Sequence, residues 1–292
     1  MGEARAAVLH GTEDLRIEYF PIPKTKEDDA VLRVEACGLC GTDHELFTGQ
    51  IAAPCPVIPG HETVGTIESI GEVAALKWGV GVGDRVAVEC WQACGRCAQC
   101  LKGTYRRCDQ HGQTDLYGMI NTERQPALYG GYATHHYLSP DSLVLPVPDQ
   151  LTSVEATLFN PLGAGIKWGV EIPDTQPGDY VAILGPGIRG LCALVAAREA
   201  GAVFIAVTGY GSNDHPRLEL AKALGADLVV DVAESDPVKS YRSATGGRLA
   251  DVVVDVTANA PGALGQAVAL SSVDATIVMA VSYTHLTLPT KA

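Results

Sequence analysis

Residues 180–190 read YVAILGPGIRG, and this stretch decides the fold of the C-terminal half. Its first five residues are apolar and predict a buried strand. Gly185, Gly187 and Gly190 then give the spacing G-x-G-x-x-G, directly before the helical pattern LCALVAAREAGA. In this context the first glycine permits a turn, the second lets backbone approach a pyrophosphate, and the third lets helix and strand pack closely. The stretch therefore predicts a dinucleotide-binding loop at a helix N-terminus, against the alternative of an ordinary turn that binds no ligand.

The alternation of strand and helix continues after this loop. Helical patterns such as LELAKALGA separate four further apolar runs, which are VFIAVT (203–208), DLVVDV (227–232), DVVVDV (251–256) and ATIVMAV (275–281). Apolar strands joined by helices form a parallel sheet that is covered on both faces, because parallel neighbours need a crossover helix between them. We therefore expect an α/β, doubly wound domain with about five strands.

The choice between NAD and NADP stays open in the sequence. An acidic residue at the end of the second strand normally hydrogen-bonds the ribose 2′-hydroxyl of NAD, and this chain has Gly209 there. Without that carboxylate, Arg189 or Arg217 could contact the 2′-phosphate of NADP. Asp214 lies a few residues further on and keeps NAD as the alternative. Besides the three loop glycines, we take Ile188, Arg189, Gly209 and Arg217 as candidate cofactor-binding residues.

The first half of the chain has a different texture. Short strand-like runs are broken by Gly, Pro or Asp and predict a turn-rich β domain; they are AAVLH (6–10), LRIEYF (15–20), AVLRVEACG (30–38), GTIESIG (65–71) and RVAVEC (85–90). The proline-rich LVLPVPDQL marks the boundary. We expect one domain over residues 1–155 and a second over residues 156–281.

Four cysteines crowd into one short segment. Cys94, Cys97, Cys100 and Cys108 have the spacing C-x2-C-x2-C-x7-C, which lets four thiolates converge on one tetrahedral ion. Such a closed site has no open coordination position, so it predicts a structural Zn²⁺. An iron–sulfur cluster and chance clustering of buried thiols are the alternatives.

Composition limits the partners and the compartment. The formal net charge of −13 would repel a nucleic acid or an anionic membrane, so we expect neither as a partner. The N-terminus MGEARAAVLH does not have the pattern of a signal peptide, and nine cysteines in such a chain favour metal ligands over disulfides. We expect a cytoplasmic protein.

Several motifs together carry a family resemblance. They are GLCGTD (38–43), GHETVGTIESIG (60–71), VGDRVAVE (82–89), the four cysteines, GGYAT (130–134), NPLGAG (160–165) and GPGIRG (185–190). In this order they resemble the zinc-dependent medium-chain alcohol dehydrogenases, over about residues 4–281. The resemblance implies a GroES-like β-rich catalytic domain followed by a Rossmann domain, with two Zn²⁺ per chain and NAD or NADP as cofactor.

The resemblance also implies roles for individual residues. Cys40 and His61 match the family's catalytic zinc ligands, and Glu62 matches the adjacent carboxylate that can approach or bind the metal. Thr42 matches the hydroxyl that relays the alcohol proton. Asp43 matches the carboxylate that orients the ligand histidine.

Asn160 departs from the family pattern. Many relatives have Glu before the Pro-Leu pair, where this chain has Asn160, a neutral and weaker ligand. Three alternatives stay open: Glu62 completes the ligand set, zinc is bound weakly, or the metal is used differently. His44 lies one residue away from the family's usual relay histidine, so it receives no role.

The implied activity is hydride transfer between an alcohol or polyol and NAD(P), with zinc as a Lewis acid. One competing hypothesis is a relative that reduces an enone or quinone without zinc. Cys40, His61 and the four cysteines disfavour it. The other is a non-catalytic protein that binds a dinucleotide and structural zinc, which Asn160 keeps open.

The end of the chain departs from the family. Residues 282–292, SYTHLTLPTKA, resemble translated sequencing-adapter read-through, and we expect them to be an artefactual tail. The sixth strand of the family's Rossmann sheet would follow residue 281, so we interpret the chain as a C-terminal truncation. We expect the 292-residue chain to be poorly soluble or inactive and the full-length form to be a homo-oligomer, either a dimer or a tetramer.

Overall fold

The chain forms two compact units, Met1–Asn160 and Pro161–Ala292. A computed structural model describes residues 2–112, 115–257, 260 and 262–280. The expected artefactual tail, residues 282–292, lies outside this described part. Among the described residues no helix is long and apolar enough to cross a membrane.

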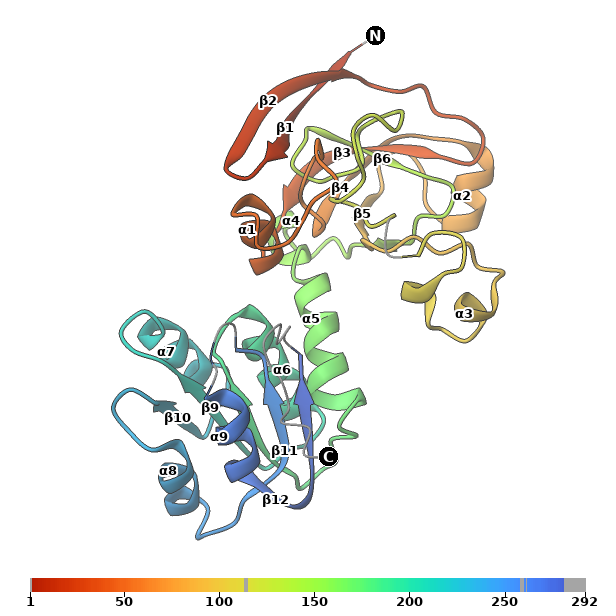
Figure 1. Cartoon of the computed structure of the whole chain (residues 1–292). Helices are drawn as coiled ribbons and strands as arrows, with labels where there is room; N and C mark the ends of the chain where they lie inside the picture. The colour runs from red at the N-terminus through yellow and green to blue at the C-terminus, as the bar shows by residue number, and fades with distance from the viewer. Residues whose placement is uncertain (1, 113–114, 258–259, 261, 281–292) are drawn as a thin grey trace, which may run out of the picture. The chain divides into compact units, whose positions relative to one another are not determined.

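The first unit is built on antiparallel strands. A hairpin of β1 (Glu3–Gly11) and β2 (Asp14–Pro21) stands beside a five-stranded sheet of order β6-β3-β4-β5-β7 (Figure 1). The strands of this sheet are β3 (Ala30–Cys37), β4 (Thr63–Ile70), β5 (Arg85–Val88), β6 (His135–Leu138) and β7 (Val144–Pro146). Buried side chains from several strands, such as Leu32, Ile67, Val86 and Leu138, form one core.

Short helices interrupt this β structure, although the sequence patterns predicted only strands and turns here. They are α1 (Gly41–Phe47), α2 (Glu72–Trp78), α3 (Ala98–Leu101), α4 (Ser153–Ala156) and the 3-10 turn η1 (Tyr105–Arg107). Helices of seven residues or fewer span at most two turns, so they give no apolar period that a sequence window can detect. Helix α1 matters most, because it carries three candidate site residues.

The second unit is a parallel, doubly wound sheet. Its order is β10-β9-β8-β11-β12, and all paired strands run parallel. The strands are β8 (Tyr180–Leu184), β9 (Phe204–Gly209), β10 (Leu228–Asp231), β11 (Ala250–Asp255) and β12 (Ser271–Met279). Each matches one of the five runs that the sequence predicted, and together with the first unit they confirm the GroES-like and Rossmann fold class.

Helices cover both faces of this sheet (Figure 1). Alternate strand residues point to opposite faces: Val181 and Ile183 pack with α6 (Ile188–Glu199) and α7 (His215–Ala223), whereas Ala182 and Leu184 pack with α8 (Pro237–Ala244) and α9 (Ala263–Leu270). This two-sided burial explains why the strands are almost continuously apolar.

The remaining helical segment packs on α6. It comprises α5 (Phe159–Ile166) and the π-helical turn η2 (Lys167–Glu171). A Cβ added at Gly165 would lie 2.5 Å from backbone of Cys192, and one at Gly169 would lie 2.9 Å from the backbone oxygen of Ala193. Because the two glycines have no side chain, the backbone of α5 and η2 packs directly against the backbone of α6.

Candidate active site and metal centres

Helix α1 positions the first candidate ligand. Strand β3 ends at Cys37, and Cys40 then forms the N-cap of α1 in an extended conformation. The Asp43 carboxylate folds back within this first turn and accepts the backbone N–H of Cys40 at 2.9 Å. Cys40 and Asp43 are both buried. The local capping contact thus fixes the thiol and the carboxylate side by side.

His61 completes the cluster from the segment just before β4. Its Nε2 lies 3.2 Å from Sγ of Cys40, and its Nδ1 lies 3.6 Å from Oδ1 of Asp43. The ring therefore presents one nitrogen to the thiol and the other to a carboxylate. A histidine that binds a metal through one nitrogen usually has its other nitrogen oriented by a carboxylate or carbonyl in this way.

The three groups adjust one another's protonation. Burial raises the pKa of the Cys40 thiol, but the contact with His61 and the charge of its ring outweigh burial, so the pKa is lowered overall. Burial also lowers the pKa of His61, whereas Asp43 and Cys40 raise it, to about 10. Each group therefore favours the charged form of the other, and a bound cation would take the place of the proton on Nε2.

The separation of these two atoms fits a shared zinc ion. Zinc lies about 2.3 Å from thiolate sulfur and about 2.0–2.1 Å from imidazole nitrogen, so a tetrahedral pair of ligands is about 3.6 Å apart. Cys40 Sγ and His61 Nε2 are 3.2 Å apart, within a few tenths of an ångström of that value. Among the described residues, the ligand atoms of Cys40, Asp43 and His61 all lie within 4.8 Å of one another.

Thr42 and Glu62 lie beside this cluster. The Thr42 side chain contacts the Cys40 thiol and helps to lower its pKa. Glu62 is buried, but its carboxylate lies against Gly38, where an added Cβ would come within 2.0 Å of Oε2. The group of ligand atoms within 4.8 Å does not include Glu62.

Asn160 contacts a different thiol. Its Nδ2 donates to Sγ of Cys90 at 3.8 Å, and burial raises the pKa of that thiol. No pattern in the sequence connects these residues, which are 70 positions apart. Their contact places the Asn160 amide against a buried, neutral thiol.

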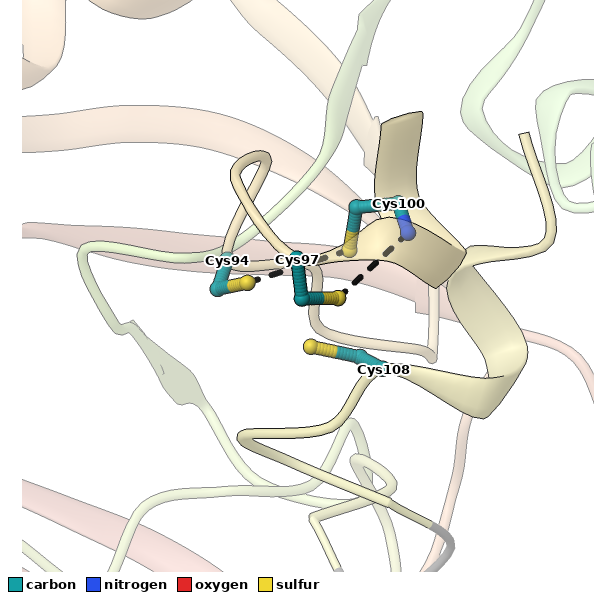
Figure 2. A group of neighbouring side chains, drawn as sticks. All are labelled: Cys94, Cys97, Cys100 and Cys108. Atoms are coloured by element: carbon teal, nitrogen blue, oxygen red, sulfur yellow. Dashed lines mark hydrogen bonds between the residues drawn. The ribbon is translucent and has the colours of Figure 1, made fainter. Parts of the chain in front are cut away.

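The four-cysteine lobe brings its thiols together (Figure 2). The sulfur atoms of Cys94, Cys97, Cys100 and Cys108 all lie within 4.8 Å of one another, and the Cys94 and Cys100 sulfurs are 3.9 Å apart. Four thiolates at about 2.3 Å from one zinc would be about 3.8 Å apart, so this arrangement fits a tetrahedral ion. Burial raises the pKa of the Cys108 thiol, but backbone N–H groups outweigh it and lower the pKa to about 6.

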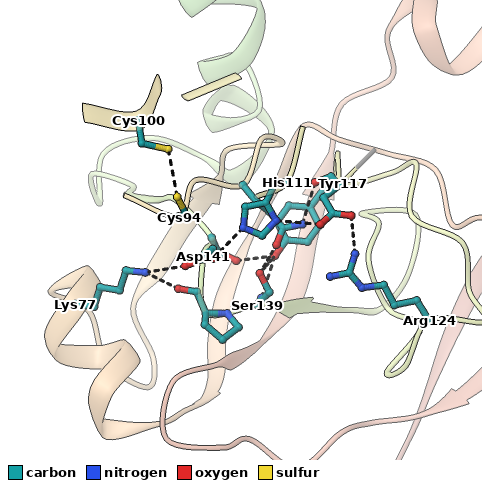
Figure 3. A network of polar contacts seen from close by, with 12 residues as sticks. Lys77, Cys94, Cys100, His111, Tyr117, Arg124, Ser139 and Asp141 are labelled. Carbon is teal, nitrogen blue, oxygen red and sulfur yellow. Dashed lines mark hydrogen bonds and ion pairs between the residues drawn. The ribbon is translucent and has the colours of Figure 1, made fainter. Parts of the chain in front are cut away.

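A charged network joins this lobe to the rest of the unit (Figure 3). His111 lies between two carboxylates, with Nδ1 3.0 Å from Asp115 and Nε2 2.9 Å from Asp141. Arg124 donates to Asp115 at 2.6 Å, and the Lys77 ammonium lies 3.6 Å from Asp141. These carboxylates raise the pKa of His111 against the effect of burial. Sequence reasoning missed this network, since its members are scattered over three segments of the chain.

The glycine-rich loop has the geometry expected of a phosphate-binding turn. Gly185 has φ +102°, a conformation that side chains rarely adopt, and Gly187 is the N-cap of α6. A Cβ at Gly190 would lie 2.0 Å from the backbone oxygen of Gly185, whereas a Cβ at Gly187 would meet no atom within 4 Å. The third glycine therefore allows close packing, and the second leaves open space at the helix N-terminus.

The two candidate phosphate-binding arginines already have partners. The Arg189 guanidinium lies over the ring of Trp168, 5.3 Å from its centroid. Arg217 donates to Oδ1 of Asp214 at 3.0 Å. Gly209 ends β9 and is buried, and Ile188 is 45% exposed in the first turn of α6.

Both clusters have spacings that fit a metal ion, and comparisons with known proteins identify the family. The alcohol dehydrogenase GroES-like domain matches residues 26–149, and the zinc-binding dehydrogenase domain matches residues 190–290. A probable alcohol dehydrogenase of Mycobacterium tuberculosis is 58% identical over 276 residues, which cover 94% of this chain and 75% of that protein. Sorbitol dehydrogenase of Bacillus subtilis is 35% identical, with 91% and 71% covered.

Solved structures show the same fold. A putative zinc-binding dehydrogenase from Sinorhizobium meliloti, bound to NADP, superposes with a TM-score of 0.82 at 27% identity, covering 96% of this chain and 77% of that one. The chain therefore belongs to the zinc-dependent medium-chain alcohol dehydrogenase family, and it is an NAD(P)-linked oxidoreductase that uses zinc.

Proposed function

We propose that this protein transfers hydride between an alcohol or polyol and NAD(P) at a zinc site formed by Cys40 and His61. The observation that carries the proposal is the 3.2 Å separation of Cys40 Sγ and His61 Nε2, with Asp43 behind the ring. The similarity to an alcohol dehydrogenase and to a sorbitol dehydrogenase supports this substrate class. Which alcohol is used is the finer question that substrate screening would answer.

Each side chain has a separate task. Cys40 and His61 would hold the metal, and the Asp43 carboxylate, 3.6 Å from Nδ1 of His61, orients the ring so that Nε2 points toward the metal. When bound, zinc polarises the substrate oxygen as a Lewis acid. Thr42 Oγ1 would accept a hydrogen bond from the substrate hydroxyl and take its proton, while the threonine's own hydroxyl proton passes to solvent. The backbone N–H groups at the start of α6, in the GPGIRG loop, hold the pyrophosphate of the cofactor.

We assign the third protein ligand to Glu62 rather than to Asn160. Glu62 follows His61 directly and is buried, and a carboxylate is a stronger zinc ligand than a neutral amide. The amide of Asn160 contacts Cys90. This assignment requires the Glu62 carboxylate to turn away from Gly38, which it now contacts.

The decisive experiment is the zinc content of Cys40→Ser. Wild-type protein should hold about two zinc ions per chain, and the variant about one, because the four-cysteine lobe keeps its own ion. Turnover should be lost while NAD(P)H binding remains. Cys55→Ser, which changes a thiol outside both clusters, should keep both ions and full turnover.

The same experiment separates the competing hypotheses. One zinc per wild-type chain, with nucleotide binding, would favour the non-catalytic protein, whereas two zinc ions without turnover would be the expected result of the truncation. Reduction of an enone or quinone by Cys40→Ser at the wild-type rate would favour the zinc-independent reductase. A single zinc per chain or that reduction would contradict the proposed activity.

We also propose that the protein is a cytoplasmic homo-oligomer, a dimer or a tetramer. All nine cysteines are unpaired, which suits a reducing compartment. The family resemblance carries the proposed assembly, which concerns the full-length form. Sedimentation velocity tests the assembly, and a concentration-independent monomer would contradict it.

A further inference from the structure

The cofactor preference can be inferred from one corner of the second unit, where β9, α7 and β10 meet. A carboxylate at the end of the second strand of such a sheet selects NAD by binding the ribose 2′-hydroxyl, but β9 ends in Gly209. A Cβ added at Gly209 would lie 3.0 Å from Cβ of Asp214. The Asp214 side chain therefore fills the space in which a residue-209 side chain would begin.

The Asp214 carboxylate is held in this place by two contacts. Its Oδ2 accepts the backbone N–H of Tyr210 at 2.9 Å, and its Oδ1 accepts from Arg217 at 3.0 Å. Asp214 is also the N-cap of α7. Arg217, a candidate for contact with a 2′-phosphate, is thus paired with Asp214, and its side chain is 58% exposed.

A second carboxylate closes the other side of the corner. Asp231, the last residue of β10, accepts the backbone N–H of Gly211 at 2.8 Å and that of Ala233 at 2.9 Å. Its other oxygen lies 2.8 Å from Nε2 of His215. Glu234 adds a third carboxylate, with its ligand oxygen within 4.8 Å of those of His215 and Asp231.

These contacts leave the corner without a good site for a phosphate. The corner contains three carboxylates but only one guanidinium and one imidazole. Its net charge is therefore negative even when His215 is protonated. The backbone N–H groups of Tyr210 and Gly211 already donate to carboxylates. Arg189 lies over the Trp168 ring instead of facing this loop. A 2′-phosphate would bring up to two more negative charges to this place.

We propose that the nucleotide site takes NAD and rejects NADP, and that Asp214 is the residue that discriminates. The inference rests on the proposed function, because it requires a dinucleotide on the GPGIRG loop. A carboxylate accepts a hydrogen bond from the ribose 2′-hydroxyl of NAD but repels the 2′-phosphate of NADP.

The test measures the binding of NADH and of NADPH to the full chain. Fluorescence energy transfer from tryptophan to the dihydronicotinamide reports the binding. NADH should bind more tightly by about tenfold or more, as a like-charge contact requires. Asp214→Asn should tighten NADPH binding and shrink this ratio. Glu219→Gln removes the same charge from an exposed position on α7 and should leave the ratio unchanged.

The outcomes separate the two levels of the proposal. If neither nucleotide binds, the proposed function fails at the loop itself. If NADPH binds as tightly as NADH or more tightly, the NAD preference is wrong although the function stands. If NADH is preferred and Asp214→Asn keeps the same ratio, the role of Asp214 is wrong. Competition by AMP against 2′-phospho-AMP on wild-type protein gives the same ratio without any variant.

Discussion

At the residue scale, Asp43 connects the fold to the chemistry. One of its oxygens caps α1 through the N–H of Cys40, and the other faces Nδ1 of His61. Burial raises the pKa of the Asp43 carboxyl, but His61 and the N–H of Cys40 outweigh burial and lower it overall. The carboxylate therefore stays ionised and directs both metal ligands toward one point.

Replacement of Asp43 by Asn tests this role. The amide keeps the size of the side chain but loses the charge that orients and stabilises the His61 ring, so zinc affinity at this site should fall by about 10- to 100-fold. Competition with a chromophoric chelator measures the affinity, and Glu45→Gln on the same helix is the control. An unchanged zinc affinity in Asp43→Asn would remove Asp43 from the site.

At the element scale, the turn between β8 and α6 contains one glycine that matters for stability and another that matters for nucleotide binding. Gly190 packs against the backbone oxygen of Gly185, whereas Gly187 faces open space. We expect Gly190→Ala to lower the free energy of unfolding by about 1–3 kcal/mol, because the strand and the helix must move apart. Gly187→Ala should change stability little but weaken NADH binding, since the second glycine admits the pyrophosphate.

Urea unfolding and NADH titration on both variants check this prediction. The two glycines lie three positions apart in one turn, so each variant serves as the matched control for the other. Equal losses of stability in the two variants, or full NADH affinity in Gly187→Ala, would contradict the assigned roles.

The four-cysteine lobe is a second element whose charges fit its metal. Residues 94–108 contain no carboxylate and carry four exposed cations, Arg96, Lys102, Arg106 and Arg107. Four thiolates around one Zn²⁺ leave a net charge of about −2, which these cations offset. Among the described residues none of 94–108 belongs to a hydrophobic core cluster, so a bound zinc and the His111 network of Figure 3 would hold the lobe in place.

Elements whose signals are local could be predicted from the sequence. The five strands of the second unit each contain a short apolar run, and the four cysteines and three glycines lie in short segments with fixed spacing. Contacts between distant segments could not. His111 and Asp141 are 30 positions apart, and Asn160 and Cys90 are 70 apart. Neither hydrophobic periodicity nor motif spacing in the sequence indicates that such distant residues are in contact.

The sequence also could not predict which neighbours the two candidate phosphate-binding arginines would contact. The sequence predicted that Arg217 could contact a phosphate, but Asp214, the N-cap of α7 three positions earlier, forms an ion pair with it. Arg189 is likewise drawn to the face of Trp168. Side-chain direction, which depends on the folded turn, decided both cases.

At the scale of the whole molecule, charge and burial set the response to pH. A net charge of −13 means that acidification first reduces repulsion between carboxylates, which by itself favours the folded state. His136 acts in the opposite direction. It is fully buried on β6, its ring meets Tyr117 edge to face at 4.6 Å, and neither ring nitrogen has a hydrogen-bond partner among the described residues.

Burial lowers the pKa of His136 to about 3, so the ring is neutral in the folded protein over the whole neutral range. An unfolded histidine takes up a proton near pH 6.5, and the unfolded state therefore gains protons that the folded state cannot. The stability that His136 contributes is complete above pH 6.5 and is lost as the pH falls from there toward about 3. Between pH 7.5 and 5.5 the loss should be about 1.4 kcal/mol.

His136→Phe should remove this loss, because phenylalanine fills the same buried space without a titrating group. Urea unfolding at pH 7.5 and 5.5, with zinc present, should show a fall in stability that is smaller in the variant by about 1.4 kcal/mol. His135→Phe is the control on the same strand, since its side chain is partly exposed and pairs with Glu68. The same fall in wild-type protein and in His136→Phe would mean that His136 is not buried as a neutral ring, and would place the acid sensitivity in another group.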